Sequence, residues 1–98
     1  MEKATKSQLK EIRELLQDKK ARDESGKFVL EGRKIVADVL EKDINLKSLF
    51  VSSDFTIDND NEKLIKDFQE INIPIFAVST KDFEHVSSLQ NSQGILAV

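Results

Sequence analysis

Apolar residues along the chain alternate between helical spacing and short runs, a pattern that predicts helices and strands in alternation. Helical spacing occurs four times, at residues 9–16, 35–40, 64–71 and 83–89. The short apolar runs between them predict four strands, at residues 27–31, 48–52, 75–78 and 94–98. Because these strands are apolar along most of their length, both faces of the sheet must be covered by helices. The pattern therefore predicts an α/β fold.

Polar residues mark the ends of several predicted elements. Thr5 and Gln8 have the spacing of a capping box, so we expect the first helix to begin there and to run to about residue 24. Gly26 is expected to end that helix in a left-handed conformation. Pro74 has no N–H to donate, which suits the first residue of the third strand. Thr80 is expected to cap the last helix.

The composition is that of one small globular domain. The chain has 98 residues, of which 39% are hydrophobic and 34% charged. We treat residues 1–98 as one domain, with a helical amino-terminal segment at about 5–24 and an α/β core at about 27–98.

No apolar run approaches the roughly 18 residues of a membrane span, and the start lacks the apolar region of a signal peptide. Cysteine is absent, which excludes disulfides, thiol catalysis and cysteine-ligated zinc, and which is compatible with the cytoplasm.

Residues that could carry enzymatic chemistry are almost absent. His85 is the only histidine, so a pair of histidine ligands is impossible. The three glycines, Gly26, Gly32 and Gly94, do not have the spacing of a phosphate-binding loop. We therefore assign no catalytic, cofactor-binding or metal-binding residue to this chain.

Positive charge is concentrated near the amino terminus. The net charge is −3, yet residues 1–34 carry +3 and residues 35–98 carry −6. Six cations fall within sixteen residues, and such side chains contact phosphates without reading base sequence. They are Lys19, Lys20, Arg22, Lys27, Arg33 and Lys34. The alternative interpretation is a solvated helix face on which lysine and glutamate alternate.

Gly32 precedes the second helix, where unpaired backbone N–H groups favour an anion and a glycine permits close approach. We therefore add Gly32 to the six cations as a candidate phosphate contact. In the alternative interpretation Gly32 only serves the turn, and Glu31 pairs with Arg22. We expect that ion pair to tie the first helix to the first strand. No stacking platform for bases is evident, because the chain lacks Trp and Tyr and its six Phe lie mostly in apolar patterns.

Two stretches of sequence resemble a known family. Residues 22–32 follow the pattern Arg-x-x-x-Gly-x-Phe-Val-x-Glu-Gly, and residues 93–98 read Gln-Gly-Ile-Leu-Ala-Val. Together they resemble the amino-terminal substrate-binding domain of the SpoU (TrmH-type) RNA ribose 2′-O-methyltransferases, over residues 10–98. The resemblance implies a three-layer α/β/α sandwich on a four-stranded mixed sheet, similar to the kink-turn-binding ribosomal proteins.

The same resemblance implies a function. The chain would bind the RNA substrate, ribosomal rather than transfer RNA, of a cytoplasmic methyltransferase that depends on S-adenosylmethionine. In this family the catalytic domain binds that cofactor and dimerises, and it is absent from this chain. Val98 lies inside the last apolar strand, so we expect the parent protein to continue beyond it. The isolated domain is expected to be a monomer without methyltransferase activity.

Two other functions stay open at this point. One is a standalone ribosome-associated RNA-binding protein of similar fold. The other is a protein-interaction domain whose basic segment is only a solvated helix. RNA binding that weakens with added salt distinguishes both RNA-binding functions from the last.

Overall fold

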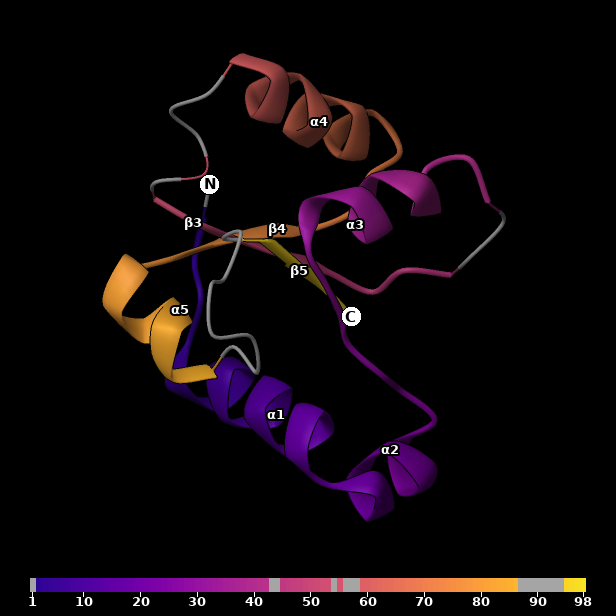
Figure 1. Ribbon diagram of the computed structural model, residues 1–98, viewed down its shortest axis with the longest axis vertical. Coiled ribbons are helices and arrows are strands. Elements are labelled where there is room, and N and C mark those ends of the chain that lie inside the picture. The colour runs from indigo at the N-terminus through magenta and orange to yellow at the C-terminus, as the bar shows by residue number, and fades with distance from the viewer. Residues whose placement is uncertain (1, 43–44, 54, 56–58, 87–94) are drawn as a thin grey trace.

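Five strands form one sheet, and helices lie along it (Figure 1). The computed structural model describes residues 2–42, 45–53, 55, 59–86 and 95–98. The strands are β1 (Glu2–Lys3), β2 (Leu30–Glu31), β3 (Leu49–Ser52), β4 (Ile75–Val78) and β5 (Ile95–Ala97). The helices are α1 (Lys6–Gln17), α2 (Lys19–Ser25), α3 (Arg33–Val39), α4 (Asn59–Glu70) and α5 (Thr80–Val86).

The strand order is β1-β4-β3-β5-β2. Strand β4 is parallel to both β1 and β3, whereas β5 is antiparallel to β3 and to β2. The predicted α/β class is confirmed, but the predicted number of four strands is wrong. The additional strand is β1, whose two residues are both exposed, so no apolar pattern announces it. Backbone hydrogen bonding holds it at the edge, and Ala4 N continues the pairing by donating to Ala77 O at 2.9 Å.

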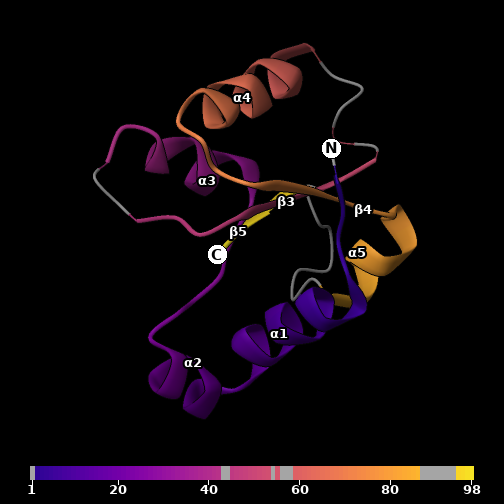
Figure 2. The ribbon, with the colours of Figure 1, turned by 180° about the vertical axis from the view of Figure 1, so that it is seen from behind.

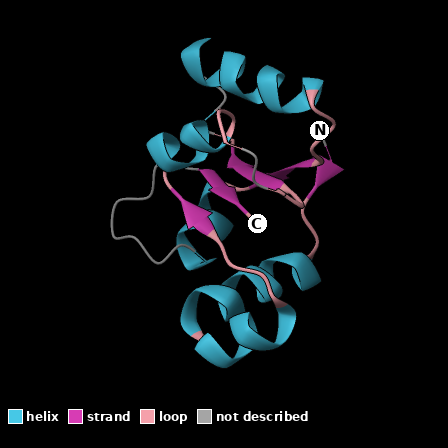
Figure 3. Cartoon of the chain, turned by 90° about the vertical axis from the view of Figure 1, so that its right-hand side faces the viewer, coloured by secondary structure: helices cyan, strands magenta, loops and turns pink. Residues whose placement is uncertain are grey.

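Side chains on the central strands alternate between two cores. Leu49 and Val51 of β3 are buried in one core, whereas Phe50 between them is buried in the other. The Phe50 ring stacks on Phe76 of β4, with 5.3 Å between the ring centroids. Figures 1 and 2 show α3 and α4 on one side of the sheet and α1, α2 and α5 on the other. Figure 3 shows the sheet from the side, between these two sets of helices. Both faces of the sheet are therefore covered, as its apolar strands require.

Most of the predicted helix ends are confirmed. Gln8 N donates to Thr5 Oγ1 at 3.1 Å, and Thr5 N donates to Gln8 Oε1 at 2.8 Å, which completes the capping box of α1. Gly26 has the left-handed φ of 68° that was expected after the basic segment. The prediction that Thr80 caps α5 is wrong. Ser79 has that role, because its Oγ accepts the N–H of Asp82 at 3.1 Å.

The predicted first helix is broken at Asp18. Its backbone is extended, with φ −125° and ψ 111°. Its N–H still donates to Glu14 O at 2.8 Å and so ends α1, while its carboxylate accepts the N–H of Lys20 at 2.9 Å and so begins α2. One residue thus ends one helix and caps the next, and a single helix to residue 24 is wrong. The cause is the short Asp side chain, which can accept a hydrogen bond from the backbone two residues further on.

The first predicted strand is shorter than expected. The prediction covered residues 27–31, but only Leu30–Glu31 pairs with β5. The N–H of Lys27 is taken by Ser25 Oγ at 3.2 Å, and the Phe28 side chain is 55% exposed. Residues 26–29 therefore cross from α2 to the sheet as a connecting segment. At the other end of the chain, the predicted helix end at 87–89 and strand start at 94 lie outside the described residues.

Candidate nucleic-acid interface

The seven candidate phosphate contacts occupy two places in the fold. Lys19, Lys20 and Arg22 lie in α2, and Lys27 follows it directly. Gly32, Arg33 and Lys34 lie at the beginning of α3. Figures 1 and 2 show α2 and α3 on opposite sides of the sheet. The seven residues therefore form two separate groups, joined by the segment 26–31.

The group on α2 is open to solvent. No residue of this helix is buried, and its two ends are capped at Asp18 and Gly26. Lys20 pairs with Glu24 at 3.8 Å, with side chains that are 79% and 69% exposed. Lys27 Nζ lies 3.3 Å from Glu11 Oε1 on α1. Exposed ion pairs of this kind contribute about 0–1 kcal/mol, so a phosphate can replace the glutamate of either pair at small cost.

Arg22 does not form the ion pair predicted with Glu31. Its Nη1 donates to Leu15 O at 2.7 Å and to Leu16 O at 3.4 Å, in the last turn of α1. Lys20–Glu24 and Lys27–Glu11 are ion pairs of this region, and neither involves Arg22. The physical reason is the break at Asp18, which leaves unpaired carbonyls at the end of α1 and turns α2 back toward them. A cation near a helix C-terminus also meets the negative end of the helix dipole.

Gly32 has a backbone conformation that only glycine adopts readily. Its φ of 109° and ψ of 144° lie in a region where a Cβ is strained. Its N–H donates to Ile95 O at 3.2 Å, and its carbonyl accepts the N–H of Val36 at 3.0 Å. The N–H of Gly32 is therefore occupied by the sheet, and the glycine is required by the turn between β2 and α3.

Arg33 connects the two helices that cover its side of the sheet. Its Nε donates to Asn61 Oδ1 of α4 at 2.6 Å, and Asn61 Nδ2 donates to Phe55 O at 3.0 Å. This chain of hydrogen bonds is partly buried. Arg33 therefore has a structural role in addition to any contact with phosphate, whereas the neighbouring Lys34 is exposed.

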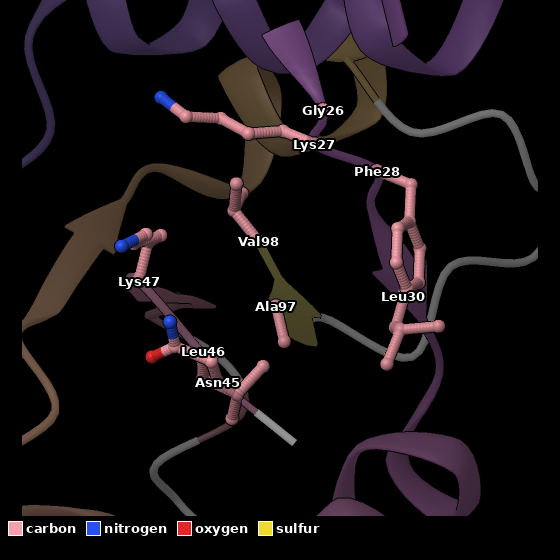
Figure 4. Close-up of a pocket in the computed structure, with 9 residues that line it drawn as sticks. All are labelled: Gly26, Lys27, Phe28, Leu30, Asn45, Leu46, Lys47, Ala97 and Val98. Atoms are coloured by element: carbon pink, nitrogen blue, oxygen red, sulfur yellow. The ribbon is translucent and has the colours of Figure 1, made fainter. Parts of the chain in front are cut away.

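A pocket beside Lys27 was not predicted from the sequence. It has a volume of about 220 Å³. Figure 4 shows Phe28 and Leu30 on one side of it, and Asn45, Leu46 and Lys47 on the other. Gly26, Lys27, Ala97 and Val98 complete the lining. In the sequence, the only sign of this pocket is a phenylalanine, Phe28, directly after Lys27. The apolar pattern placed Phe28 in a strand at residues 27–31, so its exposure was not predicted.

Within the ranges that the structure describes, no three His, Asp or Glu side chains gather as a metal site would require. His85 is exposed on α5. No helix in the same ranges is both long enough and apolar enough to span a bilayer.

Comparison with solved structures reveals close similarity of fold. An AdoMet-bound rRNA methyltransferase from Sinorhizobium meliloti shares 26% identity, with a TM-score of 0.73, over 99% of this chain and 34% of its own. A second structure, of rRNA methyltransferase from the same organism, gives the same values. A protein from Porphyromonas gingivalis assigned to the TrmH family of RNA methyltransferases shares 19% identity and the fold, with a TM-score of 0.68, over 96% of this chain and 34% of its own.

The chain thus spans about a third of the length of these solved structures. Among curated protein sequences nothing matches it. Residues 6–97 match the family described as the MRM3-like substrate-binding domain, which leaves only the first five residues and the last one outside the match. The resemblance to the amino-terminal domain of SpoU (TrmH-type) methyltransferases is confirmed by this match and by the shared fold. The chain belongs to the MRM3-like substrate-binding domain family.

Proposed function

We propose that this chain is the RNA-substrate-binding domain of an S-adenosylmethionine-dependent 2′-O-methyltransferase that acts on ribosomal rather than transfer RNA. The observation that carries the proposal is the family match over residues 6–97. Support comes from the similarity in fold to an rRNA methyltransferase that binds AdoMet. The domain's own contribution is to hold the RNA, so that the ribose to be methylated reaches a catalytic domain elsewhere in the longer protein.

We expect the cofactor to bind outside this chain. S-adenosylmethionine would supply the methyl group in the catalytic domain, which we also expect to form the homodimer in the cytoplasm. The isolated 98-residue chain would be a monomer. We also propose that its fold is a three-layer α/β/α sandwich similar to that of the kink-turn-binding ribosomal proteins, and the covering of both faces of the sheet by helices supports this.

All seven candidate residues are proposed to serve RNA binding, in different ways. Lys19, Lys20 and Lys27 would contact phosphates directly, because they are solvent-accessible and lie along one continuous segment. Arg22 would keep α2 against the end of α1. Gly32, Arg33 and Lys34 form the second group, in which Lys34 is the exposed cation. Contacts of this kind give sequence-independent affinity, with dissociation constants on the order of 10⁻⁴–10⁻⁶ M at physiological salt.

The test compares two charge-reversed variants in RNA binding. The first is Lys19→Glu/Lys20→Glu, whose acidic residues suit the first turn of α2 and so offset the loss of the Lys20–Glu24 pair. The matched control is Lys63→Glu/Lys66→Glu, which makes the same charge change on exposed positions of α4. Fluorescence anisotropy of a labelled ribosomal-RNA stem-loop is measured between about 50 and about 200 mM salt.

We expect the α2 variant to lose about two phosphate contacts. The slope of log affinity against log salt then falls in magnitude by about 1.5, at about 0.7–0.9 per contact. The control should bind with nearly the wild-type slope. Equal losses in both variants would exclude α2 as the site. Wild-type binding that does not depend on salt, or no binding at all, would contradict the proposed function and favour a protein-interaction domain.

A further inference from the structure

Phe28 is an unusually exposed aromatic residue in this fold. Its side chain is 55% exposed, whereas Phe50, Phe68 and Phe83 are each at most 3% exposed. It lies in the segment between α2 and β2, where neither helix nor strand pairing requires an aromatic ring. Ile35 and Ile71 are comparably exposed, at 51% and 54%, so exposure alone identifies no site. What distinguishes Phe28 is that its ring lines a pocket.

The pocket beside Phe28 has the size and the lining for one aromatic ring. Cavities of about 150 Å³ bind benzene, and this pocket has about 220 Å³. Figure 4 shows the Phe28 ring along one side, with Ala97 and Val98 between it and the second wall. That second wall is fixed to the sheet, because Lys47 N donates to Val98 O at 2.8 Å and Val98 N donates to Ser48 O at 3.0 Å. The sheet therefore holds this wall of the pocket in place.

Polar groups at this pocket favour a nucleotide over an apolar peptide. Lys27 and Lys47 bring two cations from separate segments of the chain to the same pocket. Asn45, which is exposed, adds an amide that can both donate to and accept from the edge of a base. The cation of Lys27 is shared with Glu11 across an exposed 3.3 Å contact, which a phosphate can displace. Lys19 and Lys20 continue the positive charge along α2.

We propose that this pocket receives one unpaired base of the RNA, stacked on Phe28, with the adjoining phosphates on Lys27 and Lys47. The inference rests on the proposed function and specifies how the RNA is held. Stacking of bases on aromatic side chains is the usual means by which proteins bind single-stranded nucleic acid. The domain would then select an unpaired loop or bulge rather than a regular duplex, which side chains read poorly.

The first experiment uses the absence of tryptophan from the chain. Phe28→Trp places a single fluorophore in the pocket, and Ile71→Trp places one at a comparably exposed position directly after α4 (54% for Ile71). We expect a short oligoadenylate to quench the emission of Phe28→Trp and to leave that of Ile71→Trp nearly constant. An abasic oligonucleotide with the same phosphates should quench neither.

The second experiment measures affinity without the aromatic ring. Phe28→Leu keeps an apolar side chain but cannot stack, and its exposed position should leave the unfolding midpoint unchanged. We expect this variant to bind oligoadenylate about 5-fold to about 100-fold more weakly, which corresponds to about 1–3 kcal/mol per stacked base. Its affinity for the abasic oligonucleotide should equal that of the wild type.

The outcomes separate this inference from the proposed function. If the wild type binds RNA while Phe28→Trp emission stays constant and Phe28→Leu binds normally, the base pocket is wrong and the proposed function stands. If the wild type binds no RNA, both are wrong. Emission from Phe28→Trp that changes with protein concentration in the absence of RNA would assign the pocket to a second copy of the chain and overturn the base pocket.

Discussion

At the scale of single residues, local hydrogen-bonding rules were the most reliable guide. The capping box of Thr5 and Gln8 follows from the sequence because both partners lie within one turn. The partner of Arg22 does not, because it depends on the break at Asp18, which turns α2 toward the carbonyls of Leu15 and Leu16. The exposure of Phe28 was missed for a similar reason: it depends on how far strand pairing extends.

Gly26 provides a prediction at this scale. Its φ is +68°, and no atom lies within 4 Å of the position that a Cβ would take. The cost of a side chain is therefore conformational rather than steric. We expect Gly26→Ala to lower the free energy of unfolding by about 1 kcal/mol, and Gly26→Asn to lower it by less, because Asn tolerates the left-handed region. Urea denaturation measures both, and an Asn variant less stable than the Ala variant would contradict the assignment.

Among the helices and strands, the apolar pattern predicts the ones that bury apolar side chains in a core. It misses the ones whose side chains stay exposed. Strands β3 and β4 were predicted almost to the residue, since apolar side chains on both of their faces enter the two cores. Strand β1 was missed because its residues are exposed and only its backbone is engaged. The boundary between α1 and α2 was missed because α2 buries no residue, so its beginning depends on one cap.

This dependence of α2 on its caps gives a prediction for the element. Asp18→Ala removes the acceptor of the Lys20 N–H and should destabilise α2 by about 1 kcal/mol. Since α2 lies outside both cores, the loss appears as local opening rather than as a lower global stability. Amide hydrogen exchange should therefore accelerate about fivefold within α2 and stay constant in α1.

The matched control for that measurement is Asp23→Ala, an exposed carboxylate within α2 that is not its cap. It should leave exchange in α2 close to that of the wild type. Equal acceleration in both variants would mean that Asp18 acts through its charge alone. Faster exchange throughout α1 as well would show that the two helices open together, which contradicts their separation at Asp18.

At the scale of the whole molecule, the α/β class follows from the alternation of patterns, but the grouping of charge does not. Six cations that are close in sequence lie on two sides of the sheet, because the segment 26–31 passes from α2 to the edge strand before α3 begins. The same crossing places Lys27 and Phe28 beside Lys47, which is distant in sequence. The pocket therefore could not be predicted without the topology.

RNA binding by this domain is tested most directly by an NMR titration of the ¹⁵N-labelled chain at low salt. The ligand is a ribosomal-RNA stem-loop that has an unpaired loop. Backbone amide shifts report contact residue by residue. We expect the shifts to concentrate in α2, in residues 26–34 and in residues 45–47, and to disappear as salt is added. Residues 60–70 of α4 should stay unchanged. Shifts centred on α4, or a spectrum that RNA does not alter, would contradict the claim that this domain holds RNA through these residues.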